Sequence, residues 1–274
     1  MTRLRAWFMA PSWVLALATV AIPFAIVLAY SVLTRGAYGG MELPWTWENY
    51  ERLFDPLYGA IFWRSVWISA AATFLCVLLG FPLALFIARS SRKNLYLSLV
   101  ILPFWTSFLI RLYAWMFLLR DTGLINTALR WTGIISEPLP LLYSGGAVVL
   151  GLVYGYLPFA VLPLYATLEK LDPHLLEAAA DLGARPFRAL LEVTLPLAKE
   201  GIWAASILVF VPCLGTFLTS DLLGGSRSIL IGNLIQNQFT TARDWPFGAA
   251  LSIALLALAA CLLWVARRRG QELL

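Results

Sequence analysis

The sequence predicts an all-α membrane protein with six transmembrane helices, and three observations support this fold class. Hydrophobic residues make up 61% of the 274-residue chain, charged residues only 13%, and the mean hydropathy is +0.79. A soluble domain carries about 25% charged residues, so a soluble enzyme is disfavoured, and so is a disordered chain. The charged residues are spaced so that six long uncharged windows remain between them. Apolar residues run consecutively inside these windows, for example over 74–79, whereas the strands of a transmembrane barrel alternate apolar and polar positions.

Each window is long enough, or nearly so, to cross a bilayer as a helix, which needs about 20 residues. The first window follows two arginines, as in a cleaved signal peptide, but its apolar stretch is longer than the usual run of about 7–15 residues. The third window continues over 112–119, beyond a lone Arg111. We expect helices because lipid offers no hydrogen-bond partners to an open backbone. The six windows are 6–34, 65–88, 94–110, 138–168, 201–220 and 245–266.

The basic residues indicate how these helices are oriented. If both termini are cytoplasmic, the inner segments carry 12 of the 20 Lys and Arg residues and the outer segments carry 7. Cytoplasmic loops are enriched in Lys and Arg, so the sequence predicts cytoplasmic termini. The same bias explains the pI of 9.3, and no nucleic-acid partner is expected. All three cysteines lie in apolar windows and there is one histidine, so no disulfide framework or metal site is predicted.

The inner loop 169–200 is predicted to carry a short amphipathic helix. Asp172 and Pro173 are a typical helix start, and Gly183 is a typical stop. From the pattern alone, the helix could lie on the membrane interface or dock in a groove of a partner protein. Three residues share one apolar face with a fourth beside them, and two acids lie on another face: Leu175, Ala179 and Leu182, then Leu176, then Glu177 and Asp181.

The spacing in this loop resembles the EAA motif of ABC importer permeases, EAA-x3-G-x9-I-x-L-P. The loop has Glu177-Ala178-Ala179, then Gly183, then 193–196 as Val-Thr-Leu-Pro, with Val193 in place of Ile. In that family the loop is a coupling helix that a cleft of the ATPase subunit receives. The resemblance therefore implies ATPase contacts for six residues: Leu176, Glu177, Ala178, Ala179, Asp181 and Gly183.

Four further stretches, 102–115, 151–184, 220–239 and 243–252, resemble the spermidine/putrescine permeases of that superfamily. The resemblance implies the type I ABC importer permease fold in a bacterial cytoplasmic (inner) membrane. It implies a first helix with an outer loop (1–60), a five-helix core that includes the coupling loop (61–268), and a cytoplasmic tail (269–274).

The same resemblance implies three kinds of partner: a second homologous permease, two ATPase subunits and a periplasmic substrate-binding protein. The chain has no GxxxxGK(S/T) phosphate-binding loop. We therefore expect ATP and Mg on the ATPase partner, no cofactor bound by this chain, and a non-catalytic role. Another small organic cation or an opine-like solute remains open as the cargo. An ATP-independent secondary transporter is the rival class, although no inverted repeat is visible between the halves.

A polyamine carries several ammonium groups, so its path is expected to offer carboxylates and aromatic faces. Tryptophans also form belts at membrane interfaces, a role that suits Trp45, Trp47 and Trp245. The candidate path residues are Asp221, Trp105, Tyr113, Trp115, Tyr154 and Asp244.

Two features inside the windows need a further explanation. Arg111 would repel a cationic substrate, so we expect it to pair with a carboxylate such as Asp221, to hold carbonyls of the partner permease, or to extend outward to the interface. Proline removes a helical hydrogen bond, so kinks are expected at Pro158 and Pro163 in the fourth window and at Pro212 in the fifth.

Overall fold

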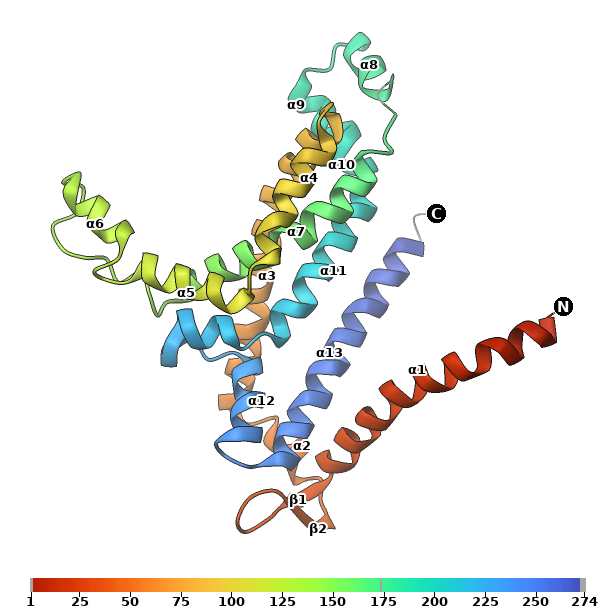
Figure 1. Ribbon diagram of the computed structural model, residues 1–274, viewed down its shortest axis with the longest axis vertical. Coiled ribbons are helices and arrows are strands. Elements are labelled where there is room, and N and C mark those ends of the chain that lie inside the picture. The colour runs from red at the N-terminus through yellow and green to blue at the C-terminus, as the bar shows by residue number, and fades with distance from the viewer. Residues whose placement is uncertain (1, 173, 272–274) are drawn as a thin grey trace. The chain divides into compact units, whose positions relative to one another are not determined.

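The computed structural model describes residues 2–172 and 174–271, most of which form helices (Figure 1). Pro173, expected in the helix start of the inner loop, and residues 272–274 of the expected tail lie outside this range. The elements in chain order are α1 (Thr2–Ser31), β1 (Leu33–Arg35), β2 (Met41–Trp45), α2 (Glu48–Arg52), α3 (Pro56–Arg89), α4 (Lys93–Ile101), η1 (Leu102–Trp105), α5 (Phe108–Leu119), α6 (Leu124–Trp131), α7 (Gly145–Leu168), α8 (His174–Asp181), α9 (Pro186–Ala189), η2 (Leu190–Thr194), α10 (Leu195–Leu197), α11 (Lys199–Gly215), η3 (Ser220–Gly224), η4 (Gly225–Ser228), α12 (Ile231–Thr240) and α13 (Trp245–Gln271).

The chain divides into two compact units. The first comprises Met1–Ala60 and Leu234–Ala260, and the second comprises Ile61–Asn233 and Cys261–Leu274. This division differs from the expected core of 61–268, because residues 234–260 group with the first 60 residues.

Three helices, α3, α7 and α11, form the core of the second unit. Fully buried side chains from all three meet there, among them Cys76, Val161 and Val209. A Cβ built on Gly201 of α11 would lie only 2.5 Å from Thr167 Oγ1 of α7. Small residues at such an interface let helices approach closely without lipid between them.

Among the described residues, three helices are long and apolar enough to cross a membrane: α3, α7 and Trp245–Val265 of α13. Two more spans result if each of two bent helix pairs is counted as one. Lys93–Trp105 and Phe108–Trp131 meet at 86°, and Pro186–Leu197 and Lys199–Gly215 meet at 69°. In α1 the apolar stretch Leu17–Ser31 is shorter.

The helix breaks lie outside the prolines of the fourth and fifth windows, and the kinks expected at those prolines stay a prediction. Helix α7 continues through Pro158 and Pro163, and α11 continues through Pro212. The third window, expected as one helix, is instead broken after η1, where Thr106 and Ser107 are extended with ψ of 148° and 134°. Lipid-facing backbone needs internal hydrogen bonds, so a break inside an apolar segment is an unusual feature.

In the first unit, residues 33–45 form a short hairpin that was not predicted from the sequence. Strand β1 pairs antiparallel with β2, so that Leu33 lies opposite Trp45. Asn49 of α2 donates hydrogen bonds to the carbonyls of Ser31 (3.1 Å) and Leu33 (2.8 Å). The end of α1, the hairpin and α2 are thereby held together.

Candidate coupling loop and solute path

Helix α8, in the loop 169–200, is closed at both ends by local hydrogen bonds. At its start, Asp172 Oδ1 accepts a bond from the N–H of His174 (3.0 Å). At its end, the N–H of Ala184 bonds to the carbonyl of Ala179 (3.0 Å) and the N–H of Gly183 bonds to the carbonyl of Ala180 (2.9 Å). This pair of bonds is a Schellman cap, and the expected stop at Gly183 is confirmed.

Gly183 is required by the backbone of this cap. Its φ is +82°, a conformation that costs a residue with a side chain about 1–2 kcal/mol. No atom lies within 4 Å of a Cβ built on Gly183, so packing inside the chain does not exclude a larger residue. The glycine of the motif therefore sets the direction in which the chain leaves the helix.

The residues predicted to contact an ATPase lie mainly on the exposed side of α8. Glu177, Ala178 and Asp181 are exposed, as is Gly183, whereas Leu176 and Ala179 are half-buried. Glu177 Oε2 lies 2.9 Å from Nδ1 of His174, and both of these side chains are largely in solvent. The exposed motif residues are thus available to a partner, and their coupling role stays a prediction.

The second half of the motif is anchored in the protein. Thr194 is 1% exposed, and Val193 lines a groove of about 370 Å³ together with Leu175 and Leu176 of α8. Pro196 has no N–H to continue the α-helical pattern, and the preceding residues form the π turn η2. The motif therefore combines an exposed capped helix with a buried anchor.

An ion pair closes the base of this loop. Lys93 Nζ, at the start of α4, lies 2.5 Å from Glu169 Oε1, just after α7. Hydrogen bonds from Lys93 and Tyr165 lower the pKa of the Glu169 carboxyl. In Figure 1, α8 and α9 lie beyond this end of the helices of the second unit.

Asp221 lies in the π turn η3, which packs against α5 and α7. A Cβ on Gly151 of α7 would lie 2.5 Å from Leu223 Cδ1. The absence of a side chain at Gly151 therefore lets η3 pack closely against α7. The amide of Asn233 donates to Asp221 Oδ1 and to the carbonyl of Phe217 (3.0 Å). Asp221 is exposed, and none of the four ion pairs among the side chains that the structure describes includes it. Such a positioned carboxylate can accept a charge-assisted hydrogen bond from an ammonium group.

Of the four aromatic candidates, the structure brings Trp115 and Tyr154 together. Their rings meet edge to face with centroids 5.5 Å apart, and both line an open groove of about 950 Å³ between α3, α5 and α7. Trp105 (88% exposed) and Tyr113 (41% exposed) lie on the surface and do not line this groove.

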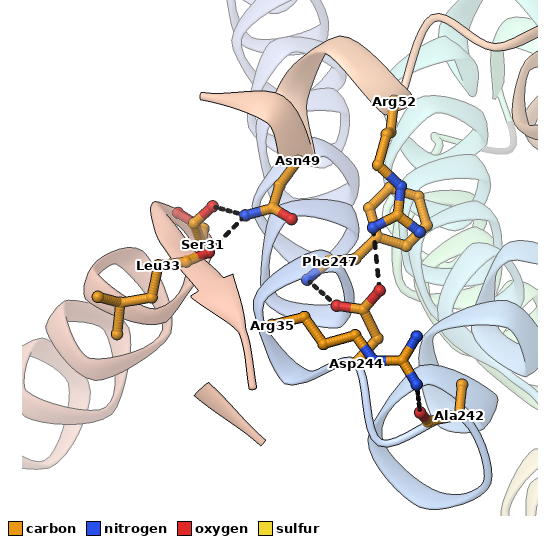
Figure 2. Close-up of polar contacts among 8 residues, drawn as sticks. All are labelled: Ser31, Leu33, Arg35, Asn49, Arg52, Ala242, Asp244 and Phe247. Atoms are coloured by element: carbon orange, nitrogen blue, oxygen red, sulfur yellow. Dashed lines mark hydrogen bonds and ion pairs between the residues drawn. The ribbon is translucent and has the colours of Figure 1, made fainter. Parts of the chain in front are cut away.

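Asp244 belongs to the first unit, where its carboxylate is already engaged (Figure 2). Arg52 Nη1 lies 2.9 Å from Asp244 Oδ2, and the N–H of Phe247 donates to Oδ1 (3.2 Å), which caps the start of α13. The Arg52 guanidinium also lies 4.0 Å from the centroid of the Phe247 ring. Nearby, Arg35 donates to the carbonyl of Ala242 (2.8 Å). Asp244 is 2% exposed, so its predicted role in the solute path remains untested while a structural role is visible.

Arg111 does not form the pair with Asp221 that the sequence suggested, since the ion pairs of the described side chains do not include these two residues. Arg111 is 8% exposed, and its guanidinium carbon lies 4.6 Å from the ring centroid of Phe104 and 5.6 Å from that of Phe108. Its Nε and Nη1 have no hydrogen-bond acceptor. Cation–π contacts contribute about 0.5–2 kcal/mol each, whereas an unpaired buried charge costs several kcal/mol. The contacts within this chain do not offset the burial of this charge.

The chain is similar in sequence and in fold to known transport proteins. Residues 77–271 match the model of the family described as "Binding-protein-dependent transport system inner membrane component". The chain is 46% identical over 256 residues to the spermidine/putrescine transport system permease protein PotB of Haemophilus influenzae, covering 93% of this chain and 90% of that protein. It is 43% identical to the protein of the same name from Escherichia coli K12, covering 93% of both.

A solved structure shares the fold. One chain of a bacterial alginate ABC transporter, crystallised with an alginate pentasaccharide-bound periplasmic protein, aligns with a TM-score of 0.79 and 17% sequence identity. The alignment covers 98% of this chain and 96% of that chain. At this identity the comparison concerns the fold alone.

Proposed function

The chain belongs to the family of binding-protein-dependent transport system inner membrane components, and we propose that it forms, with a second homologous permease, the translocation path of an ATP-driven polyamine importer. It has the type I ABC importer permease fold. Relatives more than 40% identical are named as spermidine/putrescine permeases, which supports these two amines as the cargo. In this proposal the chain crosses the membrane six times and both termini are cytoplasmic.

The capped helix α8 is the observation that carries the proposed coupling to ATP hydrolysis. Two ATPase subunits bind ATP and Mg on the cytoplasmic side, and one of them receives α8. The Schellman cap at Gly183 fixes the end of α8, and the exposed Glu177 and Ala178 face away from the chain's own core. Because Thr194 anchors the loop in the protein, a displacement of α8 is passed to η2 and α11 rather than absorbed in a free loop. This chain itself performs no ATP chemistry in the proposed assembly.

Asp221 is the proposed contact for an ammonium group of the substrate, which a periplasmic binding protein delivers. The carboxylate is exposed, its Oδ1 accepts a hydrogen bond from the neutral amide of Asn233, and it takes part in none of the ion pairs among the described side chains. The aromatic pair of Trp115 and Tyr154 lies in the groove next to α7 and offers π faces for cations or methylene groups.

The test is ATP-driven uptake by the complete complex in proteoliposomes, with ATP enclosed on the cytoplasmic side. We expect concentrative uptake of spermidine or putrescine that depends on ATP and on the binding protein, and no uptake of an opine or an acidic amino acid. ATP-independent uptake would refute the coupling, and uptake of the opine in preference to the amines would refute the assigned cargo.

A single variant tests the proposed substrate contact. Asp221→Asn removes the charge but keeps the shape, and loss of a hydrogen bond to a charged group corresponds to about a 10- to 100-fold rise in the KM for amines. Asp121→Asn is the matched control, because Asp121 is also an exposed carboxylate, in a separate polar groove beside Arg120. Equal kinetic effects of the two variants, or none from Asp221→Asn, would remove Asp221 from the path.

A further inference from the structure

The break between η1 and α5 places hydrogen-bond donors inside an apolar segment. The helices on its two sides meet at 86°, with Thr106 and Ser107 extended between them. The first N–H groups of an α-helix have no acceptor within the helix, and the side chain of Ser107 makes no capping bond to α5. The start of α5 therefore offers free donors and the positive end of a helix dipole.

Arg111 adds a full positive charge at this break. Its guanidinium lies over Phe104, which precedes the break, and over Phe108, which follows it. The side chain is more than nine-tenths buried, and Nε and Nη1 lack acceptors. A guanidinium has five donors in a fixed planar arrangement that suits a carboxylate. An anionic acceptor placed beside Arg111 would therefore satisfy these donors and neutralise the buried charge.

The described part of the chain does not supply that acceptor. Its ion pairs are all formed by side chains other than Arg111. Asp221, in the neighbouring η3, forms no ion pair with Arg111, and its Oδ1 accepts a hydrogen bond from Asn233 instead. A carboxylate that reaches Arg111 must therefore come from another molecule.

The setting selects a second membrane-spanning chain as that molecule. A polyamine is cationic and would be repelled by Arg111, and a lipid headgroup lies at the membrane surface rather than within an apolar segment. Beside the break, Trp105 is 88% exposed and Ile110 is 65% exposed, which provides apolar area for a packed helix. We infer that an Asp or Glu side chain in a span of the second permease pairs with Arg111 and anchors the two permeases to each other. This inference rests on the proposed function, which supplies the second permease.

Recovery of the second permease with the affinity-tagged chain tests this anchor, with the complete complex extracted from membranes. Truncating one partner of a buried charge pair weakens association by more than about tenfold, so Arg111→Met should recover at least tenfold less of the second permease. Arg111→Lys keeps the charge and should recover more than Arg111→Met. Arg130→Met is the matched control, because Arg130 is exposed on α6, and it should recover the wild-type amount.

The reciprocal experiment identifies the partner residue and does not depend on the stability of the Arg111 variants. Each Asp or Glu within the spans of the second permease is neutralised in turn, and one such change should lower recovery as Arg111→Met does. The double variant that combines this change with Arg111→Met should lower the recovery of the second permease no further than either single change does. Normal recovery for every neutralised variant, or normal recovery with Arg111→Met but altered amine selectivity, would overturn the anchor. If the wild-type chain recovers no second permease, the proposed function fails first and the anchor fails with it.

Discussion

Substitution of Gly183 tests whether the cap of α8 transmits force to the transport path. At φ +82° a residue with a side chain pays about 1–2 kcal/mol, which lowers the population of the capped conformation by about 5- to 30-fold. Asn tolerates this region better than Ala, and β-branched residues tolerate it least. We therefore expect ATP-driven uptake to fall in the order Gly, Asn, Ala, Val at position 183. Membrane insertion should be unchanged, because the space around the glycine is open.

The assay measures the initial rate of spermidine uptake by proteoliposomes together with the amount of ATPase recovered per tagged chain. Gly133→Ala is the matched control, since Gly133 also has positive φ (+74°) and no atom within 4 Å of a built Cβ, but lies outside the motif. It should cost the same backbone energy without loss of uptake. Full uptake by Gly183→Val, or equal losses at both glycines, would refute the reasoning.

Three further predictions concern stability of the purified chain in detergent, followed by thermal unfolding. Gly151→Ala should lower the free energy of unfolding by about 1–3 kcal/mol through overpacking. Gly145→Ala should leave it unchanged, because a Cβ at Gly145 meets open space. Equal losses of stability for the two variants would contradict the packing argument. Asp244→Ala should lower the free energy of unfolding by about 1–3 kcal/mol, because it breaks a buried ion pair whose cation is partly exposed. Asp244→Asn can still cap α13 and should lower this free energy by less. A larger loss for Asp244→Asn than for Asp244→Ala would contradict the capping role. The pKa of Glu169 is lowered from 4.5, so the stabilisation by its pair with Lys93 should be present above pH 4.5 and be lost as the pH falls towards the lowered pKa. Glu169→Gln should abolish this loss of stability at acid pH. If the variant keeps the pH profile of the wild type, the Lys93–Glu169 pair is not the cause of that loss.

The sequence by itself determined the features that depend on local chemistry. Helix α8 lies between a carboxylate cap at Asp172 and the glycine cap at Gly183, as its capping residues indicated. Capping bonds join residues a few positions apart, so their signal is contained in a short stretch of sequence. The long apolar windows likewise identified the segments that form α3, α7 and α13, because hydropathy over about 20 residues is a property of composition.

Tertiary structure decided how distant residues combine, and the reason is that no local signal encodes such contacts. Arg52 and Asp244 are separated by 192 positions, and neither residue's neighbours in the sequence indicate the pair. The break at Thr106 and Ser107 likewise contradicts the uniform hydropathy of its window, because hydropathy reports how apolar a segment is and carries no information about backbone direction. Asp221 was chosen for its charge, but its attachment to Asn233 and its freedom from Arg111 follow from the packing of η3 against α5 and α7. Local propensities thus placed the helices along the chain, while side-chain packing across those helices decided which charges are paired and which remain available to a partner or a solute.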